Sequence, residues 1–400
     1  MYIKNVSLVS WRNISMTSAD FEDGVNVLWG LNAQGKSNIL ESIYYFARGR
    51  SFRGGRDSEL IRFGADYASA SLTYRRAGYE NDTVLDCVIP KSGKKILRKN
   101  SVNLSSAAEM LGMFRAVLFC PRDLALVTGG PLERRTFLDV ALSQLSESYL
   151  TYLRRYTKAL NERNALLKRA AAGESVSSAE WEVYAEVMAE AAGIVCAYRS
   201  DYTSMLARNV GRYFSDMTSG EEVPQLRYTS HALYDGIPAP LSDTDSGKIQ
   251  NILYDKLLSN IEREEACGST LWGIHKDDIS IMINGREIKM YASQGQQRSA
   301  ALALKLGEAE IAYELGGEYP VMLLDDVFSE LDEKRRKYIL DILADNEGEK
   351  RQIIITSCEP DIIPKERLSR VRFDCVSNGR VIGEADADYG LTDAEANNVR

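Results

Sequence analysis

The sequence contains no uninterrupted apolar run of about 18 residues, the length that a membrane-spanning helix needs. Its first residues, Met1-Tyr2-Ile3-Lys4-Asn5, also lack the charged-then-apolar layout of a secretion signal. We therefore expect a soluble, cytoplasmic protein that makes no use of a membrane.

Paired cysteines and a surplus of basic residues are also missing. The six cysteines are far apart, with no paired spacing, which argues against a disulfide framework and against a zinc site. The 49 Lys and Arg residues are outnumbered by 57 Asp and Glu residues, so the net charge is −8. This balance argues against a generally basic surface that coats nucleic acid, so any DNA or RNA contact must come from local basic patches.

A phosphate-binding pattern organises the chain: two glycines bracket four residues and are followed by lysine and serine. The pattern consists of Gly30, Leu31, Asn32, Ala33, Gln34, Gly35, Lys36 and Ser37. Residues 25–29 before it read as a strand, and apolar residues on one helical face follow it, which disfavours the alternative of an ordinary glycine-rich turn. We expect backbone N–H groups to hold phosphates, Lys36 to reach the terminal phosphates, and Ser37 to bind Mg²⁺.

Two carboxylates close a second apolar strand, residues 321–326. In this arrangement the first acid, Asp325, holds the magnesium shell, and the next, Asp326, can orient or deprotonate a water. A third buried strand, residues 352–357, ends in two hydroxyl residues that could reach the γ-phosphate region. Because Lys36 and Asp325 lie near opposite ends of the chain, the nucleotide domain must be built from both ends.

The hexamer Ser293-Gln294-Gly295-Gln296-Gln297-Arg298 precedes a helical pattern. It places serine and glycine N–H groups at a helix start, which suits phosphate, although taken alone it would be only a good helix cap.

The fold class predicted from these patterns is α/β, with mixed sheets and an inserted α-helical domain. Residues 1–131 and 268–376 form one domain, residues 132–267 form the insert, and the acidic residues 377–400 are expected to be disordered. Strands are predicted at 2–9, 68–74, 83–89, 95–97 and 116–119, with residues 2–9 and 25–29 in one small N-terminal sheet. Residues 269–278 are read as a return to strand, followed by a hairpin at 279–285. The insert is predicted to be a helical hairpin that turns at 170–175, with helices too short for an extended coiled-coil arm.

Two segments concentrate positive charge: Arg48–Arg56, which also contains Phe52, and Lys91–Lys99. The arginine segment suits phosphate contacts, but it could as well be a solvated loop or serve the nucleotide or an acidic partner. The lysine segment could contact DNA, although a charge run is usually a solvated hairpin tip. His275, followed by Lys276, Asp277 and Asp278, could be a ligand or a base, but a hydrogen-bonded structural role is as consistent with the pattern, and we assign it no catalytic role.

Taken in order, these strings resemble the ATP-binding-cassette ATPases, their branch shared with SMC proteins, and within it the RecF family. The matching segments are 30–43, 49–53, 118–124, 275–278, 293–298 and 324–332. Two departures stand out: Ile274 and Lys276 replace the family's more usual proline and arginine, and Asp326 replaces the glutamate of most cassette ATPases. The shorter carboxylate is normal for RecF-like proteins and suggests slow hydrolysis.

The resemblance implies an ATP-dependent homodimer in which Ser293, Gly295 and Gln296 of one subunit cap the ATP bound by the other. It puts Arg12 against the nucleotide, gives Asp325 the magnesium and gives Asp326, with Lys36, the catalytic role. It further implies a weak DNA-dependent ATPase that binds single-stranded, gapped or junction DNA and acts with RecR and RecO to help load RecA. The alternatives are the ATPase subunit of a membrane transporter and a nucleotide-binding structural protein without DNA affinity.

Overall fold

The computed structural model describes residues 1–218, 220, 222–230, 239–240, 246–344, 351–359 and 371–383. Contacts between backbone positions divide the chain into two compact units. The head unit contains Met1–Arg122 and the chain from Ala312 onward, and the helical unit contains Asp123–Ile311. This division groups residues 268–311 with the helices, whereas the sequence boundaries grouped them with the nucleotide domain.

The first sheet of the head unit brings the two chain ends together in the order β16-β15-β3-β14-β13-β8. Its strands are β3 (Val25–Trp29), β8 (Ala116–Phe119), β13 (Val321–Asp325), β14 (Ile353–Ser357), β15 (Val371–Ser377) and β16 (Arg380–Gly383). All pairings are parallel except that of β15 with β16. Strands β8, β13 and β14 are buried throughout, as expected for a parallel sheet with both faces covered.

A second, antiparallel sheet of the head unit runs in the order β2-β1-β4-β5-β6-β7. It contains β1 (Tyr2–Trp11), β2 (Ile14–Asp20), β4 (Tyr67–Arg75), β5 (Thr83–Pro90), β6 (Ile96–Lys99) and β7 (Val102–Asn103). Burial alternates along β4 and β5, which is the pattern of a sheet with one covered face. The prediction that residues 2–9 and 25–29 share one sheet is wrong, because β3 pairs with strands from the other chain end.

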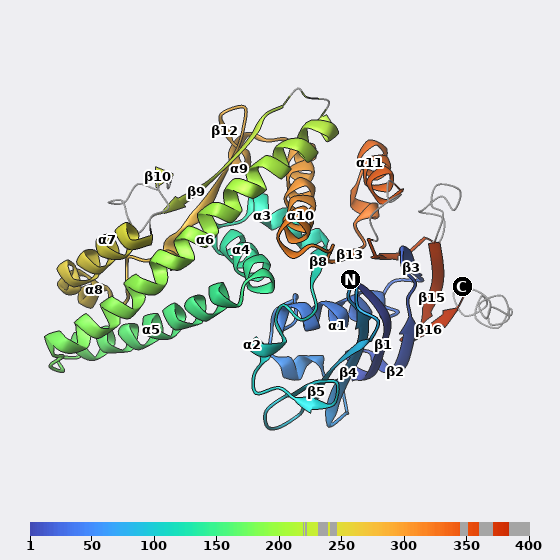
Figure 1. Ribbon diagram of the computed structural model, residues 1–400, viewed down its shortest axis with the longest axis horizontal. Helices are drawn as coiled ribbons and strands as arrows, with labels where there is room; N and C mark the ends of the chain where they lie inside the picture. The colour runs from blue at the N-terminus through green and yellow to red at the C-terminus, as the bar shows by residue number, and fades with distance from the viewer. Residues whose placement is uncertain are drawn as a thin grey trace, which may run out of the picture. The chain divides into compact units, whose positions relative to one another are not determined.

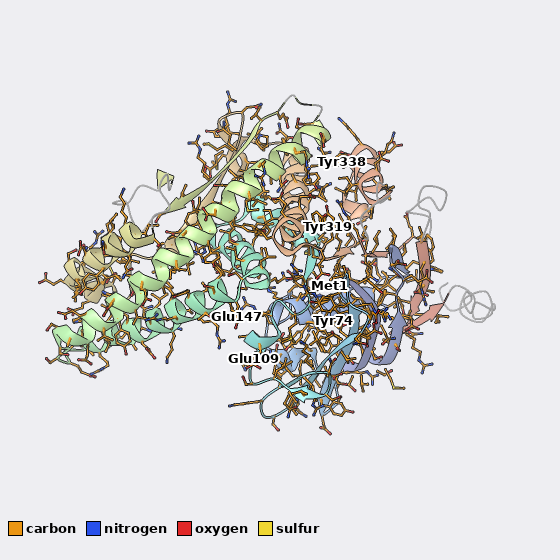
Figure 2. The ribbon with its side chains drawn as sticks, viewed as in Figure 1. Met1, Tyr74, Glu109, Glu147, Tyr319 and Tyr338 are labelled. Atoms are coloured by element: carbon orange, nitrogen blue, oxygen red, sulfur yellow. The ribbon has the colours of Figure 1, made fainter. Side chains whose placement is uncertain are left out.

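The helical elements of the head unit are α1 (Lys36–Arg48), η1 (Asp57–Leu60), α2 (Ala107–Met110), η4 (Phe328–Glu330) and α11 (Glu333–Ala344). Helix α1 buries an apolar face that includes Ile39, Leu40 and Ile43. Met1 and Tyr74, labelled in Figure 2, are also buried in this unit, and the Tyr74 ring packs edge-on against Phe114. The core of the unit therefore draws on residues from well-separated parts of the chain.

The helical unit is dominated by α5 (Glu147–Ala171) and α6 (Ser178–Thr218), which pack against each other (Figure 1). The other helical elements are η2 (Pro121–Leu124), at the unit boundary, α3 (Ala125–Thr128), α4 (Pro131–Leu145), α7 (Ser246–Ser259), α8 (Ile261–Cys267), η3 (Ile274–Lys276), α9 (Ile288–Tyr291) and α10 (Gln294–Gly316). The residues of α10 from Ala312 onward belong to the head unit. The predicted turn at 170–175 is confirmed. Helix α6 is 41 residues long, and the sequence analysis had set no length for it. None of the helices within the described ranges is long and apolar enough to cross a bilayer.

A four-stranded sheet in the order β10-β9-β11-β12 completes the helical unit. Its strands are β9 (Pro224–Ser230), β10 (Ala239–Pro240), β11 (Asp278–Ile283) and β12 (Arg286–Glu287). The sequence analysis missed β9, which lies inside the predicted helical region and pairs with β11 over six residues. The hairpin of β11 and β12 is confirmed.

Two further predictions are wrong. Residues 269–277 form no strand, because Gly273 has a φ of 140° and the chain then turns through η3. The expected disorder from residue 377 fails for residues 377–383, because β16 pairs with β15; the rest of the acidic tail lies outside the described residues. The fold class itself, an α/β head with mixed sheets and inserted helices, is confirmed.

Candidate nucleotide site

The phosphate-binding pattern forms a loop between β3 and α1, as predicted. Gly30 has a φ of 149°, and a Cβ there would lie 2.4 Å from the carbonyl oxygen of Val376, so a side chain does not fit. Gly35, with a φ of 113°, directly precedes α1, and no described side chain caps the start of that helix. Uncapped N–H groups at a helix start are a ready site for phosphate.

Lys36 is folded back into this loop. Its ammonium donates to the carbonyl oxygens of Gly30 (2.6 Å) and Leu31 (2.8 Å), and it lies 3.8 Å from the sulfur of Cys358. The side chain is only 7% exposed, although Leu31, Asn32 and Ala33 around it are exposed. A buried ammonium held by weak neutral acceptors can exchange them for phosphate oxygens, which form stronger, charge-assisted hydrogen bonds.

Amide side chains fix the shape of the loop, and two of them, Asn13 and Asn38, were not assigned to the site by the sequence analysis. Asn13 donates from Nδ2 to the Ala33 carbonyl (2.9 Å) and accepts at Oδ1 from Asn38 Nδ2 (2.7 Å). On the other side, the Gly379 N–H donates to the Gln34 carbonyl oxygen and the Asn378 N–H to Gln34 Oε1. No local pattern marked Asn13, because its partners lie about 20 residues away in sequence. The loop is thus braced from both neighbouring sheets.

Asp325 lies at the carboxyl end of β13, beside Thr356 of β14. Thr356 Oγ1 donates to Asp325 Oδ1 (2.9 Å) and accepts from the Asp326 N–H (3.0 Å). Thr356 also pairs with Leu28 on β3, so the strand carrying the phosphate loop is only one strand further along. Ligands of open α/β sheets bind at this edge, and the hard oxygens of Asp325 and Ser37 suit Mg²⁺.

Asp326 has a φ of 53°, which is unusual for a residue with a side chain. Such backbone conformations persist where the surrounding structure imposes them, and they concentrate at functional sites. Here the hydrogen bond from its N–H to Thr356 holds the conformation. The sequence analysis gave Thr356 as a residue that could reach the γ-phosphate region; in the structure its hydroxyl bonds the Asp325 carboxylate and the Asp326 N–H.

Arg12 is held by a carboxylate of α1. Its Nε and Nη2 donate to the two oxygens of Glu41 at 2.9 and 2.8 Å, and Nη1 donates to the Glu59 carbonyl. The Glu41 side chain is fully buried and also accepts from Ser51 Oγ at 2.5 Å. The hydrogen bonds to Glu41 raise the pKa of the Arg12 guanidinium. This pairing gives Arg12 a structural role that the sequence did not indicate.

Ser293 stands immediately before α10 and forms a reciprocal cap with Gln296. The Gln296 N–H donates to Ser293 Oγ (3.3 Å), and the Ser293 N–H donates to Gln296 Oε1 (2.6 Å). Gln296 Nε2 also donates to Glu222. Gly295 lies in the first turn, and Ser293 and Gln294 are exposed. The helix start predicted for phosphate contact is thus at the surface of the helical unit.

The two basic segments are partly used within the head unit. Lys95 donates to Tyr45 Oη, the Gly49 carbonyl and Asp57 Oδ2 at 2.7–2.8 Å. Arg53 donates to Asn38 Oδ1 and lies over the Phe52 ring. Of the remaining cations, Arg50, Arg56, Lys91, Lys94 and Lys99 are exposed.

The His275 loop forms a buried structural cluster in the helical unit. His275 Nδ1 lies 2.7 Å from Tyr156 Oη and Nε2 lies 3.1 Å from the Thr270 carbonyl, and burial lowers the pKa of His275 to about 4. Asp277 is fully buried and accepts from Tyr228 Oη (2.6 Å) and Ser230 Oγ. Burial raises the pKa of Asp277. These contacts support the structural interpretation of the segment.

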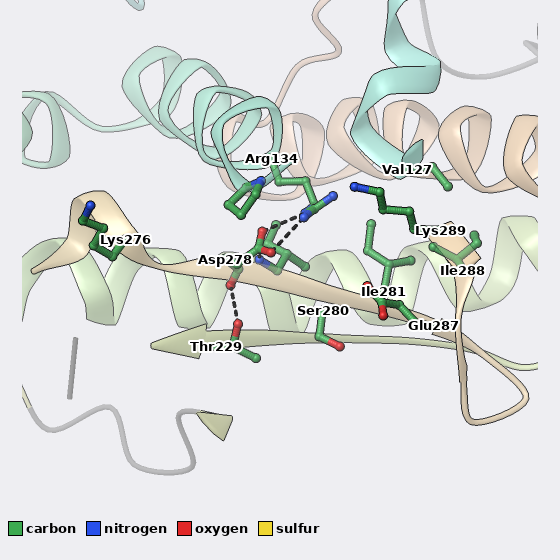
Figure 3. Close-up of a pocket in the computed structure, with 12 residues that line it drawn as sticks. Val127, Arg134, Thr229, Lys276, Asp278, Ser280, Ile281, Glu287, Ile288 and Lys289 are labelled. Atoms are coloured by element: carbon green, nitrogen blue, oxygen red, sulfur yellow. Dashed lines mark hydrogen bonds and ion pairs between the residues drawn. The ribbon is translucent and has the colours of Figure 1, made fainter. Parts of the chain in front are cut away.

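Asp278 and Lys276 line a pocket of about 330 Å³ within the helical unit (Figure 3). Arg134 of α4 makes two hydrogen bonds to the Asp278 carboxylate, at 2.7 and 2.8 Å. Lys289 of α9 also lines the pocket. Three cations, Arg134, Lys276 and Lys289, and two carboxylates, Asp278 and Glu287, therefore line a hollow whose other walls are mostly apolar.

A phosphate-type loop beside Asp325 and Asp326, which both bond the Thr356 hydroxyl, in a head built from both chain ends, defines a P-loop nucleotide-binding head of the SMC type. The sequence model described as RecF/RecN/SMC N terminal domain matches residues 2–377. An SMC head domain from Pyrococcus furiosus, at 17% identity, shows the same fold with a TM-score of 0.55 over 97% of this chain and 98% of its own.

More specific relatives cover nearly the whole chain. A DNA replication and repair protein RecF from Clostridium novyi (strain NT) is 39% identical over 383 residues, which is 95% of this chain and 99% of the relative. A solved structure of the recombination mediator protein RecF with ATP, in the RecFOR pathway, matches with a TM-score of 0.84 at 33% identity, covering 96% of this chain and 99% of that one. The chain belongs to the RecF family. These relatives do not favour the alternative of a transporter ATPase.

Proposed function

We propose that this chain is an ATP-dependent DNA-binding protein of recombinational repair and replication-fork maintenance. The proposal rests on one observation above all: the braced phosphate loop and the Asp325–Thr356 pair stand on neighbouring strand ends of a RecF-family head. The RecF relatives are named for DNA replication and repair, and one of them was solved with ATP. ATP binds the loop from Gly30 to Ser37, and Ser37 and Asp325 hold Mg²⁺.

The chain's own residues supply binding and orientation at this site. Lys36 exchanges its carbonyl partners for phosphate oxygens, and the start of α1 adds uncapped N–H groups. When bound, Mg²⁺ supplies charge neutralisation for the phosphates. Asp326, held by Thr356, orients a water, and the short carboxylate makes hydrolysis slow, so that ATP acts as a switch.

Two copies complete each site. Ser293, Gly295 and Gln296 of one subunit cap the nucleotide bound by the other, and Arg12 reaches the nucleotide while it holds Glu41. Exposed residues of the loop, such as Leu31 at 75%, and the exposed Ser293 support this arrangement, since both surfaces are accessible. The closed dimer binds single-stranded, gapped or junction DNA and works with RecR and RecO to help load RecA.

Sedimentation with ATP, with ADP and without nucleotide tests the dimer. Wild-type protein dimerises with ATP but not with ADP or without nucleotide. Lys36→Arg and Ser293→Arg remain largely monomeric with ATP. Ser175→Arg, in the exposed turn between α5 and α6, is the matched control and dimerises normally. A wild-type chain that binds ATP with Mg²⁺ and remains monomeric would refute the shared site.

Mixing two defective variants gives a sharper test. A heterodimer of Lys36→Ala and Ser293→Arg contains one intact site, made of the loop from the second variant and the helix start from the first. ATP-dependent dimers should therefore reappear in the mixture, although neither variant forms them alone.

Binding of a labelled gapped duplex, measured with ATP at two salt concentrations, tests the DNA function, because phosphate contacts weaken steeply with salt.

A further inference from the structure

One aromatic side chain of the head unit stands fully in solvent. Phe63 is 103% exposed, more than any other large apolar residue in the described ranges. It lies in the segment Arg62-Phe63-Gly64-Ala65, between η1 and β4. A fully exposed Phe gains nothing for the fold of the unit, because it buries no apolar area.

The exposure of Phe63 is built into the backbone. The Ala65 N–H donates to the Arg62 carbonyl (2.9 Å), and Gly64 has a φ of 85°, so the four residues form a tight turn. The turn is anchored at its base, where the Arg62 N–H donates to the Ser10 carbonyl and the Arg12 N–H to the Leu60 carbonyl. A ring presented on a pinned turn is ordered before any ligand arrives, which reduces the entropy lost on binding.

The basic hairpin tip lies beside this turn. The Lys91 N–H donates to the Asp66 carbonyl (2.8 Å), and Tyr67, 48% exposed, pairs with Pro90 across β4 and β5. Residues 62–67 and 91–95 together contain four cations and one carboxylate, Asp66. In a chain of net charge −8, this local excess of positive charge is notable.

Three of those four cations are turned to the surface. Arg62, Lys91 and Lys94 are exposed, whereas Lys95 is held by Asp57, Gly49 and Tyr45. Lys95 therefore fastens the hairpin to α1 and leaves the others for a ligand. Aromatic faces interleaved with cations are the combination that binds single strands, because bases stack on the rings while cations contact the phosphates.

We propose that Phe63 and Tyr67, with Arg62, Lys91 and Lys94, form a platform for single-stranded nucleic acid on which an unpaired base stacks against Phe63. The platform rests on the proposed function, since it names the surface through which that DNA binding occurs. Duplex DNA cannot bind the platform in this way, because paired and stacked bases present no free face to the Phe63 ring.

Equilibrium binding of a single strand with one 2-aminopurine, in the presence of ATP and Mg²⁺, tests the platform. Wild-type protein should quench the 2-aminopurine fluorescence. Phe63→Ala should bind at least about fivefold more weakly and lose the quenching, because one stacked base is worth about that factor or more. Phe63→Trp should retain both, and Phe63→Leu should lose the quenching although it stays apolar.

Charge and control variants complete the experiment. Log affinity falls as log salt concentration rises. Lys91→Glu and Lys94→Glu should each make this slope less steep, by about 0.7 for each phosphate that the protein no longer neutralises. Val102→Ala, which removes another exposed apolar side chain of the head unit, and Lys99→Glu should leave the quenching unchanged. Normal DNA binding by Phe63→Ala would overturn the platform while leaving the proposed function intact.

Two other results also decide the matter. If Phe63→Ala loses only ATP-dependent dimerisation and still quenches, the ring contacts a second copy and the platform is wrong. If wild-type protein binds no DNA at all, the proposed function fails and the platform fails with it.

Discussion

Replacing Arg12 by alanine tests how much the buried Arg12–Glu41 ion pair contributes to the stability of the head unit. The substitution removes both hydrogen bonds to a carboxylate that is 0% exposed. Ser51 Oγ still donates to Glu41, and Arg53 remains 4.0 Å away. Removing one partner of a buried ion pair costs about 3–5 kcal/mol, and we expect about 3 kcal/mol because these two groups remain.

The backbone adds little to this figure. Arg12 has a φ of 54°, and alanine is as strained there as arginine. The change in unfolding free energy therefore measures the loss of the side-chain contacts. The free energy of unfolding is measured by urea titration without nucleotide. Because the chain has two units and could unfold in more than one step, the slope of that free energy against urea concentration is compared between variants. The double variant Arg12→Ala/Glu41→Gln should regain most of the loss, since a neutral amide is less costly to bury and can still bond Ser51.

The same pair separates two roles of Arg12. If the double variant recovers stability but binds ATP poorly, Arg12 also contacts the nucleotide, as the family resemblance implied. If it recovers both, the role is structural alone. An unfolding free energy for Arg12→Ala within about 0.5 kcal/mol of wild type, the range of ordinary surface substitutions, would refute the reasoning from burial.

Three further predictions concern the buried titratable groups His275 and Glu318 and the backbone at Gly273. His275 should titrate with a pKa of about 4 by NMR, and a normal pKa would contradict its burial. Because its folded pKa lies below the unfolded value, the free energy of unfolding is not reduced by this group above about pH 6.5 and falls as the pH drops toward 4. Burial opposes ionisation of Glu318, but hydrogen bonds from the Ala77 N–H and Arg76 outweigh it and lower the pKa of Glu318 to about 2. The loss of unfolding free energy in Glu318→Gln should therefore be largest above about pH 4.5 and vanish toward pH 2. Urea unfolding at a series of acid pH values measures this loss, and a pH-independent difference would contradict the argument. Gly273→Ala, whose Cβ would meet Tyr156 Oη at a φ of 140°, should cost about 1–3 kcal/mol of unfolding free energy, more than Gly285→Ala, which meets nothing within 4 Å; equal losses would contradict the steric argument.

The sequence predicted the phosphate loop and both flanking elements because those interactions are local. Glycine spacing, an apolar strand and a helical face fall within about 20 residues, and the strand β3 has the predicted bounds. The carboxylate strand β13 was predicted for the same reason, since a continuous apolar run closed by two acids needs no distant partner to be read.

The sheet that joins these elements was harder to predict. The sequence required that both chain ends meet, but it placed β1 and β3 together, because alternation along a strand does not reveal its neighbour. Strand β9 was missed inside a helical region for the same reason, since its pairing with β11 lies about 50 residues away. Hydrogen-bond partners across such distances depend on the fold as a whole.

What the sequence alone determined is the chemistry available: a phosphate loop, a carboxylate pair, a serine-glycine helix start and two basic segments. What only the tertiary structure decided is how each charge is used. Lys95 and Arg12 are bound to Asp57 and Glu41, whereas Phe63 is left in solvent beside exposed lysines. Burial and partner geometry set the energy of a charge or a ring, and both arise from residues far apart in the chain.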